Sequence, residues 1–264
     1  MLLRMVNFKS VLCEPGVLGF SGEGTWYHNA ARKLGMDWTD VTFVSETVTA
    51  VPWPNINPGL DEILPQWVGR AQQMPAKPFL ISFVAMSGSP PLRLDEAQQF
   101  TEKVGKKQPW LQGVAGLLVE FGELDADRGK DSLCAEVGKT LDELGELHLP
   151  LVARFAATMP VPVLEFTGRH PECNALWIAS TGDPRIGLTG RHRLPFTAEK
   201  VALARAAGVK TPIIADGVRG RLDAFGLYQA GARGFGIGQT TLARPRRRRQ
   251  ILAMARRLSA LDEA

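Results

Sequence analysis

Two glycine turns near the carboxyl end of the chain are the first candidates for chemistry. Each of two short apolar runs, Pro212–Ala215 and Gly234–Gly238, leads into a glycine with polar neighbours. Such turns let backbone N–H groups converge on an anion, and the loops after the last two strands of a parallel barrel are the usual phosphate site. Plain tight turns are the alternative. The predicted phosphate contacts are Gly217, Val218, Gly238 and Gln239.

A second candidate is a group of carboxylates that follows the apolar run Val114–Phe121. Glu120 is the next-to-last residue of this run, and Glu123, Asp125 and Asp127 follow it. Acidic loops are usually solvated, and Asp125 and Asp127 are assigned to that class. Glu120 is the better site residue because it lies closest to the strand. No histidine stands at ligand spacing, so no metal site is predicted here.

Glu46 is a charge inside an apolar run, Val41–Thr49. A carboxylate in such a strand is costly unless it is paired, so Glu46 is either a site residue or one half of a structural salt bridge. Regular alternation would place Glu46 and Val48 on the face opposite Ser45, Thr47 and Thr49.

Arg154 is the corresponding cation, near the end of the run Leu149–Phe155. A lone cation in a buried strand needs an anionic partner. Glu46, Glu120 or a bound ligand could supply it.

Other catalytic arrangements find little support. None of the histidines stands beside an obvious serine or cysteine nucleophile, which argues against a hydrolytic triad. The three cysteines are far apart, so disulfides and a thiolate metal site are not expected. These residues are His28, His148, His170, His192, Cys13, Cys134 and Cys173.

Regularly spaced apolar runs that alternate with helical segments would position these residues. Eight such alternations in 264 residues predict an α/β protein, a (β/α)8 TIM barrel formed as a single domain over residues 1–264, with an open parallel sheet as the fallback. The strands are predicted at Gly16–Phe20, Val41–Thr49, Phe79–Ala85, Val114–Phe121, Leu149–Phe155, Ala175–Ser180, Pro212–Ala215 and Gly234–Gly238. The helices are predicted at Tyr27–Leu34, Leu60–Gln73, Leu94–Lys106, Ser132–Leu147, Val161–Phe166, Thr197–Ala207, Leu222–Ala230 and Arg247–Leu261.

Composition and charge narrow the class of protein. The formal net charge is +4, and no apolar run reaches the length of a membrane span. The first ten residues lack the apolar segment of a signal peptide, which predicts a cytoplasmic protein without a membrane partner. The run Arg244–Arg249 is either a solvated surface or a docking site for an anionic or protein partner. Among the partners that could dock on this run, nucleic acid ranks last, because no aromatic residues are interleaved with the arginines.

Several motifs, in order, resemble the dihydroorotate dehydrogenase-like flavoproteins, which are FMN-binding TIM barrels. Pro15 to Gly22 resembles the family's Asn-Pro opening and its small-residue turn, with Glu14 where Asn is usual. The segment 44–49 resembles its Thr-Lys-Thr-Val-Thr strand, and Pro150–Phe155 resembles its Pro-Val-x-Val-Lys-Leu strand. The segment 187–190 resembles its Gly-Leu-Ser-Gly loop, and 212–218 with 230–238 resembles its two phosphate-holding strands.

This resemblance implies FMN as the cofactor and an oxidoreductase acting on a CH–CH group. It implies that Arg154 faces the flavin's electron-rich edge and that Glu120 or Glu123 replaces the family's base. The residues it assigns to FMN are Ser21, Gly22, Glu46, Thr47, Arg154, Ser180, Thr181, Gly187, Gly217, Val218, Gly238, Gln239 and Thr240.

The departures from the family are at the residues that matter for its reaction. Glu46 and Arg154 replace two lysines, and the loop after residue 121 lacks the family's cysteine or serine base. The asparagine-rich segment that grips orotate is also replaced, so dihydroorotate is not the expected substrate.

Two main hypotheses follow. One is an FMN-dependent oxidoreductase with a different substrate. The other is a flavin-free, catalytically degenerate barrel that serves binding or assembly, with the arginine run as its docking surface. A flavin-free barrel enzyme acting on a phosphorylated metabolite is a third. A homodimer is a further expectation for the chain.

Overall fold

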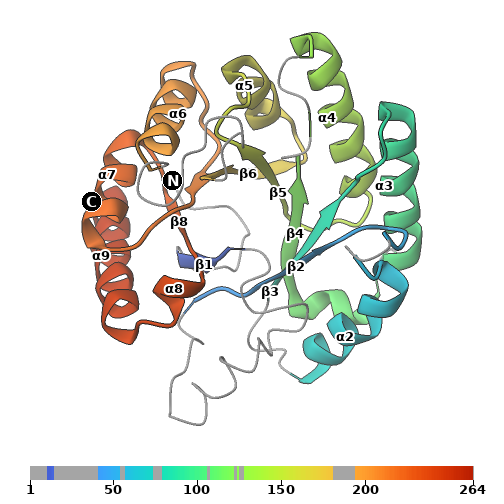
Figure 1. Cartoon of the computed structure of the whole chain (residues 1–264), viewed down its shortest axis with the longest axis horizontal. Helices are drawn as coiled ribbons and strands as arrows, with labels where there is room; N and C mark the ends of the chain where they lie inside the picture. The colour runs from blue at the N-terminus through green and yellow to red at the C-terminus, as the bar shows by residue number, and fades with distance from the viewer. Residues whose placement is uncertain are drawn as a thin grey trace.

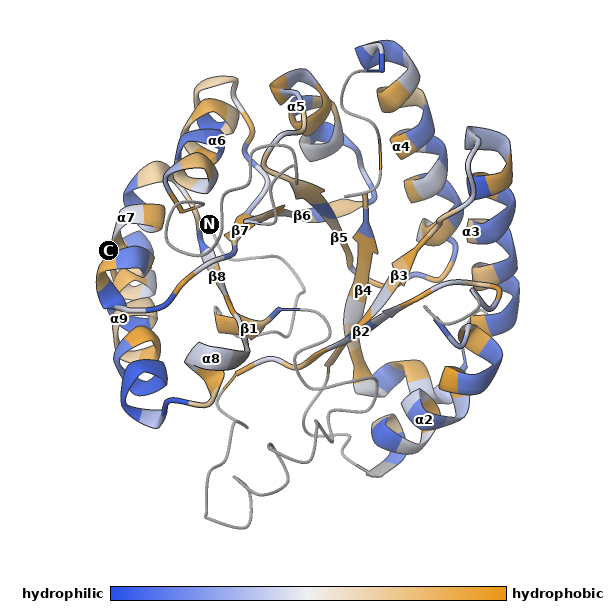
Figure 2. Ribbon diagram, viewed as in Figure 1, coloured by the Kyte–Doolittle hydropathy of each residue, from blue (hydrophilic) through white to orange (hydrophobic). Residues whose placement is uncertain are grey.

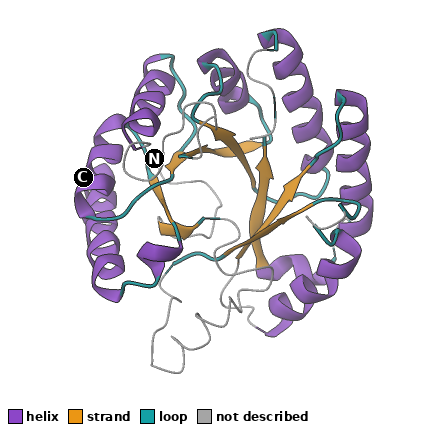
Figure 3. Ribbon diagram, in the orientation of Figure 1, coloured by secondary structure: helices purple, strands orange, loops and turns teal. Residues whose placement is uncertain are grey.

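Eight parallel strands form a barrel surrounded by helices (Figures 1 and 3). The structure is a computed structural model, and it describes residues 11–14, 41–53, 57–73, 79–105, 108–121, 124, 128–180 and 194–263. The strands are β1 (Val11–Cys13), β2 (Val44–Val48), β3 (Phe79–Val84), β4 (Val114–Glu120), β5 (Leu151–Ala156), β6 (Cys173–Ala179), β7 (Ile213–Ala215) and β8 (Gly234–Ile237).

The helices follow the strands in the order expected for this architecture. They are α2 (Leu60–Gln73), α3 (Pro90–Val104), α4 (Lys130–Gly145), α5 (Val161–Arg169), α6 (Leu194–Ala206), α7 (Arg221–Ala230), the short α8 (Gln239–Leu242) and α9 (Pro245–Glu263). A 3-10 turn, η1 (Pro109–Gly113), precedes β4. In Figure 2 the helices are banded, with hydrophilic residues on their outer sides and hydrophobic residues toward the strands.

The sheet closes through a single bridge. The strand order is β1-β8-β7-β6-β5-β4-β3-β2, and every pair is parallel. The two ends meet where Cys13 N donates to Thr42 O at 2.9 Å and Thr42 N donates to Val11 O at 3.0 Å. The predicted α/β fold, a (β/α)8 barrel, is therefore confirmed.

Two apolar layers hold the barrel together. A large cluster, including Phe79, Phe83 and Phe155, lies between strands and helices. A smaller cluster comes from seven strands and fills the barrel interior. This inner cluster consists of Leu12, Val44, Leu80, Ala115, Leu118, Val152, Ala175, Trp177 and Ile214.

The eighth strand contributes glycines to the interior instead of side chains. Gly236 pairs in register with Leu12, and Gly234 pairs with Ile214, so both face the interior. A Cβ on Gly234 would lie 2.8 Å from Ile214 Cγ1. The bare inner face of β8 leaves room for the large residues opposite.

Some predicted boundaries are wrong, and others are not tested. The first strand described is Val11–Cys13, whereas the predicted Gly16–Phe20 and the predicted helix Tyr27–Leu34 lie outside the described residues. α3 begins at Pro90, four residues before the prediction, because proline is favoured in the first helical turn. α2 has the predicted bounds, while the one-turn helix α8 has no predicted counterpart.

The predicted alternation along β2 is also wrong. The register with β3 shifts between Val44 and Thr47, so the strand is bulged there. Ser45 is buried and its Oγ accepts from Ser82 N at 2.9 Å, while Glu46 is exposed. Val48, expected on the face of Glu46, is fully buried. A bulge adds a residue to one strand, which moves the side chains after it to the other face.

Candidate functional site

Arg154 forms the centre of a charged network inside the carboxyl-terminal end of the barrel. Its register partner on β4 is Glu120 and on β6 is Trp177, so all three face the interior. Arg154 Nη1 donates to Glu120 Oε1 at 2.7 Å and to Oε2 at 2.9 Å, and Nη2 donates to Asp216 Oδ2 at 2.8 Å. The network links β4, β5 and the residue after β7.

The charges in this network compensate one another. Burial works to lower the pKa of Arg154, but the carboxylates of Glu120 and Asp216 raise it above its usual value. The side chain of Asp216 is only 1% exposed, and Arg154 is its ion-pair partner. Arg154 Nε is buried and has no hydrogen-bond partner among the described residues. Glu120 was one of the predicted partners of Arg154, and Asp216 was not foreseen.

Trp177 and Gly236 fix the position of Asp216. Trp177 Nε1 donates to Asp216 Oδ1, and the guanidinium of Arg154 lies 5.7 Å from the centre of the indole ring. A Cβ at Gly236 would collide with Asp216 Oδ1 and lie 3.1 Å from Trp177 Cζ2. The carboxylate and the indole therefore occupy the space that a side chain on β8 would need.

Glu14, directly after β1, adds a third carboxylate at the mouth of the barrel. Its Oε1 accepts a hydrogen bond from Gly217 N at 3.4 Å. A Cβ on Gly238 would lie 3.0 Å from its Oε2. Glu14 thus lies between the turn after β7 and the turn after β8.

The surroundings of Glu14 give it an unusual acidity. Burial, and after it the negative charge of Asp216, raise the pKa of Glu14 from 4.5 to about 7, against the opposing effects of Arg154, the Gly217 N–H and Arg219. A carboxyl group with this pKa exchanges a proton readily at neutral pH. In the sequence, Glu14 stands out only as a departure from a motif of the flavoprotein family. The signal that could have found it is a carboxylate at the end of a short apolar run, the same signal that indicated Glu120.

The predicted phosphate turns do lie side by side. Gly217 has φ of +88°, which favours glycine, and a Cβ there would lie 3.3 Å from Ser180 Cβ. Of the predicted donors, Gly217 N bonds Glu14, and Val218 N donates to Gly236 O at 3.2 Å. Two amides assigned to a phosphate are therefore engaged within the chain.

At Gly217 and Val218, the contacts that the resemblance assigns to FMN compete with contacts within the chain itself. A phosphate at Gly217 would meet the Glu14 side chain, which repels an anion when it is ionised. Gly238 O accepts from Thr241 N and Leu242 N, both at 3.0 Å, which turns the chain into α8. Thr240 is exposed.

The remaining predicted site residues are dispersed or not described. Thr47 shares a 2.9 Å hydrogen bond with Ser82, and partial desolvation raises the pKa of the exposed Glu46. Ser180 borders Gly217. Ser21, Gly22, Glu123, Thr181 and Gly187 lie outside the described residues, and so do Asp125 and Asp127. Within the described ranges, no three His, Cys, Asp or Glu side chains form a group that could hold a metal ion.

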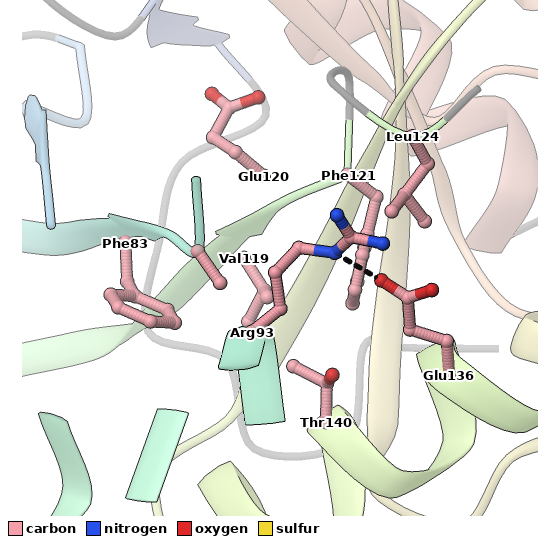
Figure 4. Close-up of a pocket in the computed structure, with 9 residues that line it drawn as sticks. Phe83, Arg93, Val119, Glu120, Phe121, Leu124, Glu136 and Thr140 are labelled. Atoms are coloured by element: carbon pink, nitrogen blue, oxygen red, sulfur yellow. Dashed lines mark hydrogen bonds and ion pairs between the residues drawn. The ribbon is translucent and has the colours of Figure 1, made fainter. Parts of the chain in front are cut away.

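A pocket that Glu120 also borders lies beside β3 and β4, lined by Phe83, Phe121 and Thr140 among others (Figure 4). Arg93 bonds Glu136 there, and Glu136 also pairs with Arg128 at 2.7 Å. Burial opposes ionisation of Glu136, but the two arginines lower its pKa. In Figure 4 the Glu120 carboxylate lies apart from this pair. We assign the Arg93–Glu136 pair to the packing of α3 against α4.

No helix among the described segments is both long and apolar enough to cross a membrane. No protein-family model matches the chain, and no curated protein matches it.

Solved structures match at low sequence identity. The chain is similar to the Amycolatopsis orientalis BexX/CysO complex structure, with a TM-score of 0.54 and 12% identity over 96% of this chain and 89% of that one. It is also similar to the FabK M276A mutant from Thermotoga maritima, with a TM-score of 0.52 and 14% identity, over 90% of this chain and 64% of that one. At these identities the likeness is one of fold, and it identifies the chain as a TIM-barrel protein.

Proposed function

We propose that the mouth of this barrel is the acid–base site of an enzyme that works on a small polar molecule without a flavin. The observation that carries the proposal is the contact between Glu14 Oε1 and Gly217 N, with Gly238 beside Oε2. This contact places a carboxylate of the chain itself where the resemblance expects the phosphate of FMN.

The position of Glu14 suits proton transfer. It follows β1, and TIM-barrel active sites lie at the carboxyl ends of the strands. With a pKa of about 7, the group is both an acceptor and a donor near neutral pH. Glu120 suits this role less well than the sequence predicted, because both of its oxygens accept from Arg154.

Arg154 would act by position and charge. Glu120 and Asp216 hold its guanidinium in place inside the mouth, and its charge opposes the rise in the pKa of Glu14. Fixed charges near a proton-transfer group set its pKa without moving during the reaction. In this arrangement Glu14 carries the proton, burial and the charge of Asp216 raise its pKa, and Arg154 limits that rise.

An FMN-dependent oxidoreductase acting on a substrate other than dihydroorotate is the second candidate. The order of the motifs that resemble the flavoprotein family supports it, and so does Arg154, a cation at the β5 position that would face the flavin. It requires the Glu14 carboxylate to leave Gly217.

The two candidates separate in a simple experiment. We expect freshly purified protein to lack a flavin absorbance band and to leave the fluorescence of added FMN unchanged. A bound flavin, or saturable quenching of FMN by the wild-type protein, would favour the second candidate and overturn the first.

Acid–base activity is tested by hydrogen exchange. The protein is incubated in D2O with a panel of small carbonyl compounds, and deuterium incorporation is followed by NMR from about pH 5 to about pH 9. We expect exchange that Glu14→Gln abolishes and that Glu102→Gln, a change on the outer helix α3, leaves intact. Equal exchange in the wild-type and Glu14→Gln proteins, or none in either, would support the flavin-free binding barrel instead.

A further inference from the structure

The net positive charge of this chain comes from its last segment. Residues 244–264 hold seven arginines and two acidic residues, whereas residues 1–243 hold 24 basic and 25 acidic residues. The formal net charge of +4 is therefore the sum of +5 in this segment and −1 elsewhere. Such asymmetry is typical of a surface that binds a polyanion.

Helix α9 presents four of these arginines on its outward face. Its inner face packs on the barrel through the buried Ile251, Leu252, Ala255 and Leu258. Arg248 belongs to that inner face, where it is 4% exposed and donates to Leu242 O at 2.9 Å. The outward, exposed positions at helical spacing are Arg246, Arg249, Gln250, Ala253, Arg256 and Arg257. In Figure 2 the start of α9, next to α8, is strongly hydrophilic.

Among the side chains that the structure describes, the outward arginines have no carboxylate partners. None of Arg246, Arg249, Arg256 and Arg257 forms an ion pair with any residue that the structure describes. The nearby Asp262 accepts from Tyr228 at 2.7 Å and pairs with Arg233 at 2.7 Å. The first turn of α9 contains no acidic residue that would offset its arginines. The helix dipole is also unfavourable to positive charge at this end of the helix.

The spacing of the arginines matches a duplex. Arg246 with Arg249, and Arg256 with Arg257, form two groups whose centres are nine residues apart, or roughly 13 Å along a helix. The major groove of a nucleic-acid duplex is about 12 Å wide, with phosphates along both edges. Gln250 and Ala253, which lie between the groups, are short enough to let the helix approach.

We propose that the outward face of α9 docks on the sugar–phosphate backbone of a nucleic-acid duplex. Arginine suits this because its planar guanidinium donates two parallel hydrogen bonds to a phosphate. The face offers no aromatic side chain, which excludes base stacking with single strands as its mode of binding. The apolar side of α9 is already used against the barrel, so the helix has no such side to bury in a membrane.

This surface is independent of the reaction at the barrel mouth. From the sequence alone, nucleic acid ranks last as a partner of Arg244–Arg249, because aromatic residues are not interleaved with the arginines and the net charge is modest. A duplex backbone needs no aromatic partner, and the distribution of the arginines over one helix face is visible only in the fold.

The test measures fluorescence anisotropy of a labelled duplex of about 20 base pairs, as DNA and as RNA, at about 50 mM salt. We expect a dissociation constant in the micromolar range. A plot of the logarithm of the association constant against the logarithm of the salt concentration should have a slope of about −3.6, which corresponds to four phosphate contacts. A variant with Arg246, Arg249, Arg256 and Arg257 all changed to Gln is expected to bind at least about tenfold more weakly.

The matched control changes four exposed basic residues elsewhere, Lys130, Lys139, Lys210 and Arg221, to Gln, which removes the same charge. It is expected to bind the duplex within about twofold of wild type, and circular dichroism checks both variants for folding. Equal weakening in the two variants overturns the proposal. So does a lack of duplex binding by the wild type, or tighter binding of poly-glutamate or of phosphatidylserine vesicles.

Discussion

The carboxylate of Glu14 and the backbone amide of Gly217, separated by 203 residues in the sequence, meet at 3.4 Å in the mouth of the barrel. Because β1 and β7 both pair with β8, the barrel brings their ends together. Burial and the charge of Asp216 then make Glu14 a weaker acid than a solvated glutamate.

This pKa shift predicts how stability depends on pH. Glu14 binds its proton more tightly in the folded chain, so its contribution is most favourable below about pH 4.5 and declines as the pH rises through about 7. The shift corresponds to at most about 3 kcal/mol of unfolding free energy. In urea denaturation at a series of pH values, Glu14→Gln should lose this decline. A decline of the same size in the variant would assign it to other groups.

A side chain at Gly236 should destabilise the fold. Gly236→Ala places a methyl group against Asp216 and Trp177 in the packed interior, with an expected cost of about 1–3 kcal/mol or more. Gly226→Ala is the control, because a Cβ there meets nothing within 4 Å and alanine favours the helix. Thermal unfolding compares the two. Equal stability of both variants would contradict the placement of Asp216.

The effects of substituting Arg154, Glu120 and Asp216 on stability should depend on one another. Arg154→Met leaves Glu120 and Asp216 without their buried cation, and should cost about 3–5 kcal/mol. Adding Glu120→Gln and Asp216→Asn removes the uncompensated charges, so the triple variant should be more stable than Arg154→Met alone. A triple variant less stable than the single one would show that the three groups act separately.

The cysteines should differ in reactivity. Cys13 and Cys173 are buried, and burial raises the pKa of Cys173 to about 12, whereas Cys134 is partly exposed on α4. A thiol reagent should therefore modify Cys134 first in the native protein, because the thiolate is the reacting form. Mass spectrometry of the modified peptides gives the order. Early modification of Cys173 would argue against the described packing of β6.

The sequence predicted the architecture well because its signals are local. The apolar run Phe79–Ala85 and the helical pattern of Leu60–Gln73 can each be recognised within a short segment of sequence. The bulge at Glu46 left no such signal, since it depends on the contact between Ser45 and Ser82. The one-turn helix α8 is too short to show a period.

The site was predictable only in part. A buried arginine on one strand and a glutamate on the next suggested the Arg154–Glu120 pair, which the structure contains. Asp216 was overlooked because it stands beside a glycine turn that suggested a phosphate. Whether Asp216 and Glu14 meet at that turn is set by strand register and by the missing side chain of Gly236, and neither is visible in a local pattern.

The most direct test of the account is the titration of Glu14 itself. Carbon-13 NMR of glutamate-labelled protein, with Glu14→Gln to assign the signal, follows the side-chain carboxyl group through the pH range. We predict a midpoint of about 7 for Glu14 in the free protein. A midpoint near the ordinary value of 4.5 would contradict the buried carboxylate at Gly217, and the acid–base role proposed for it.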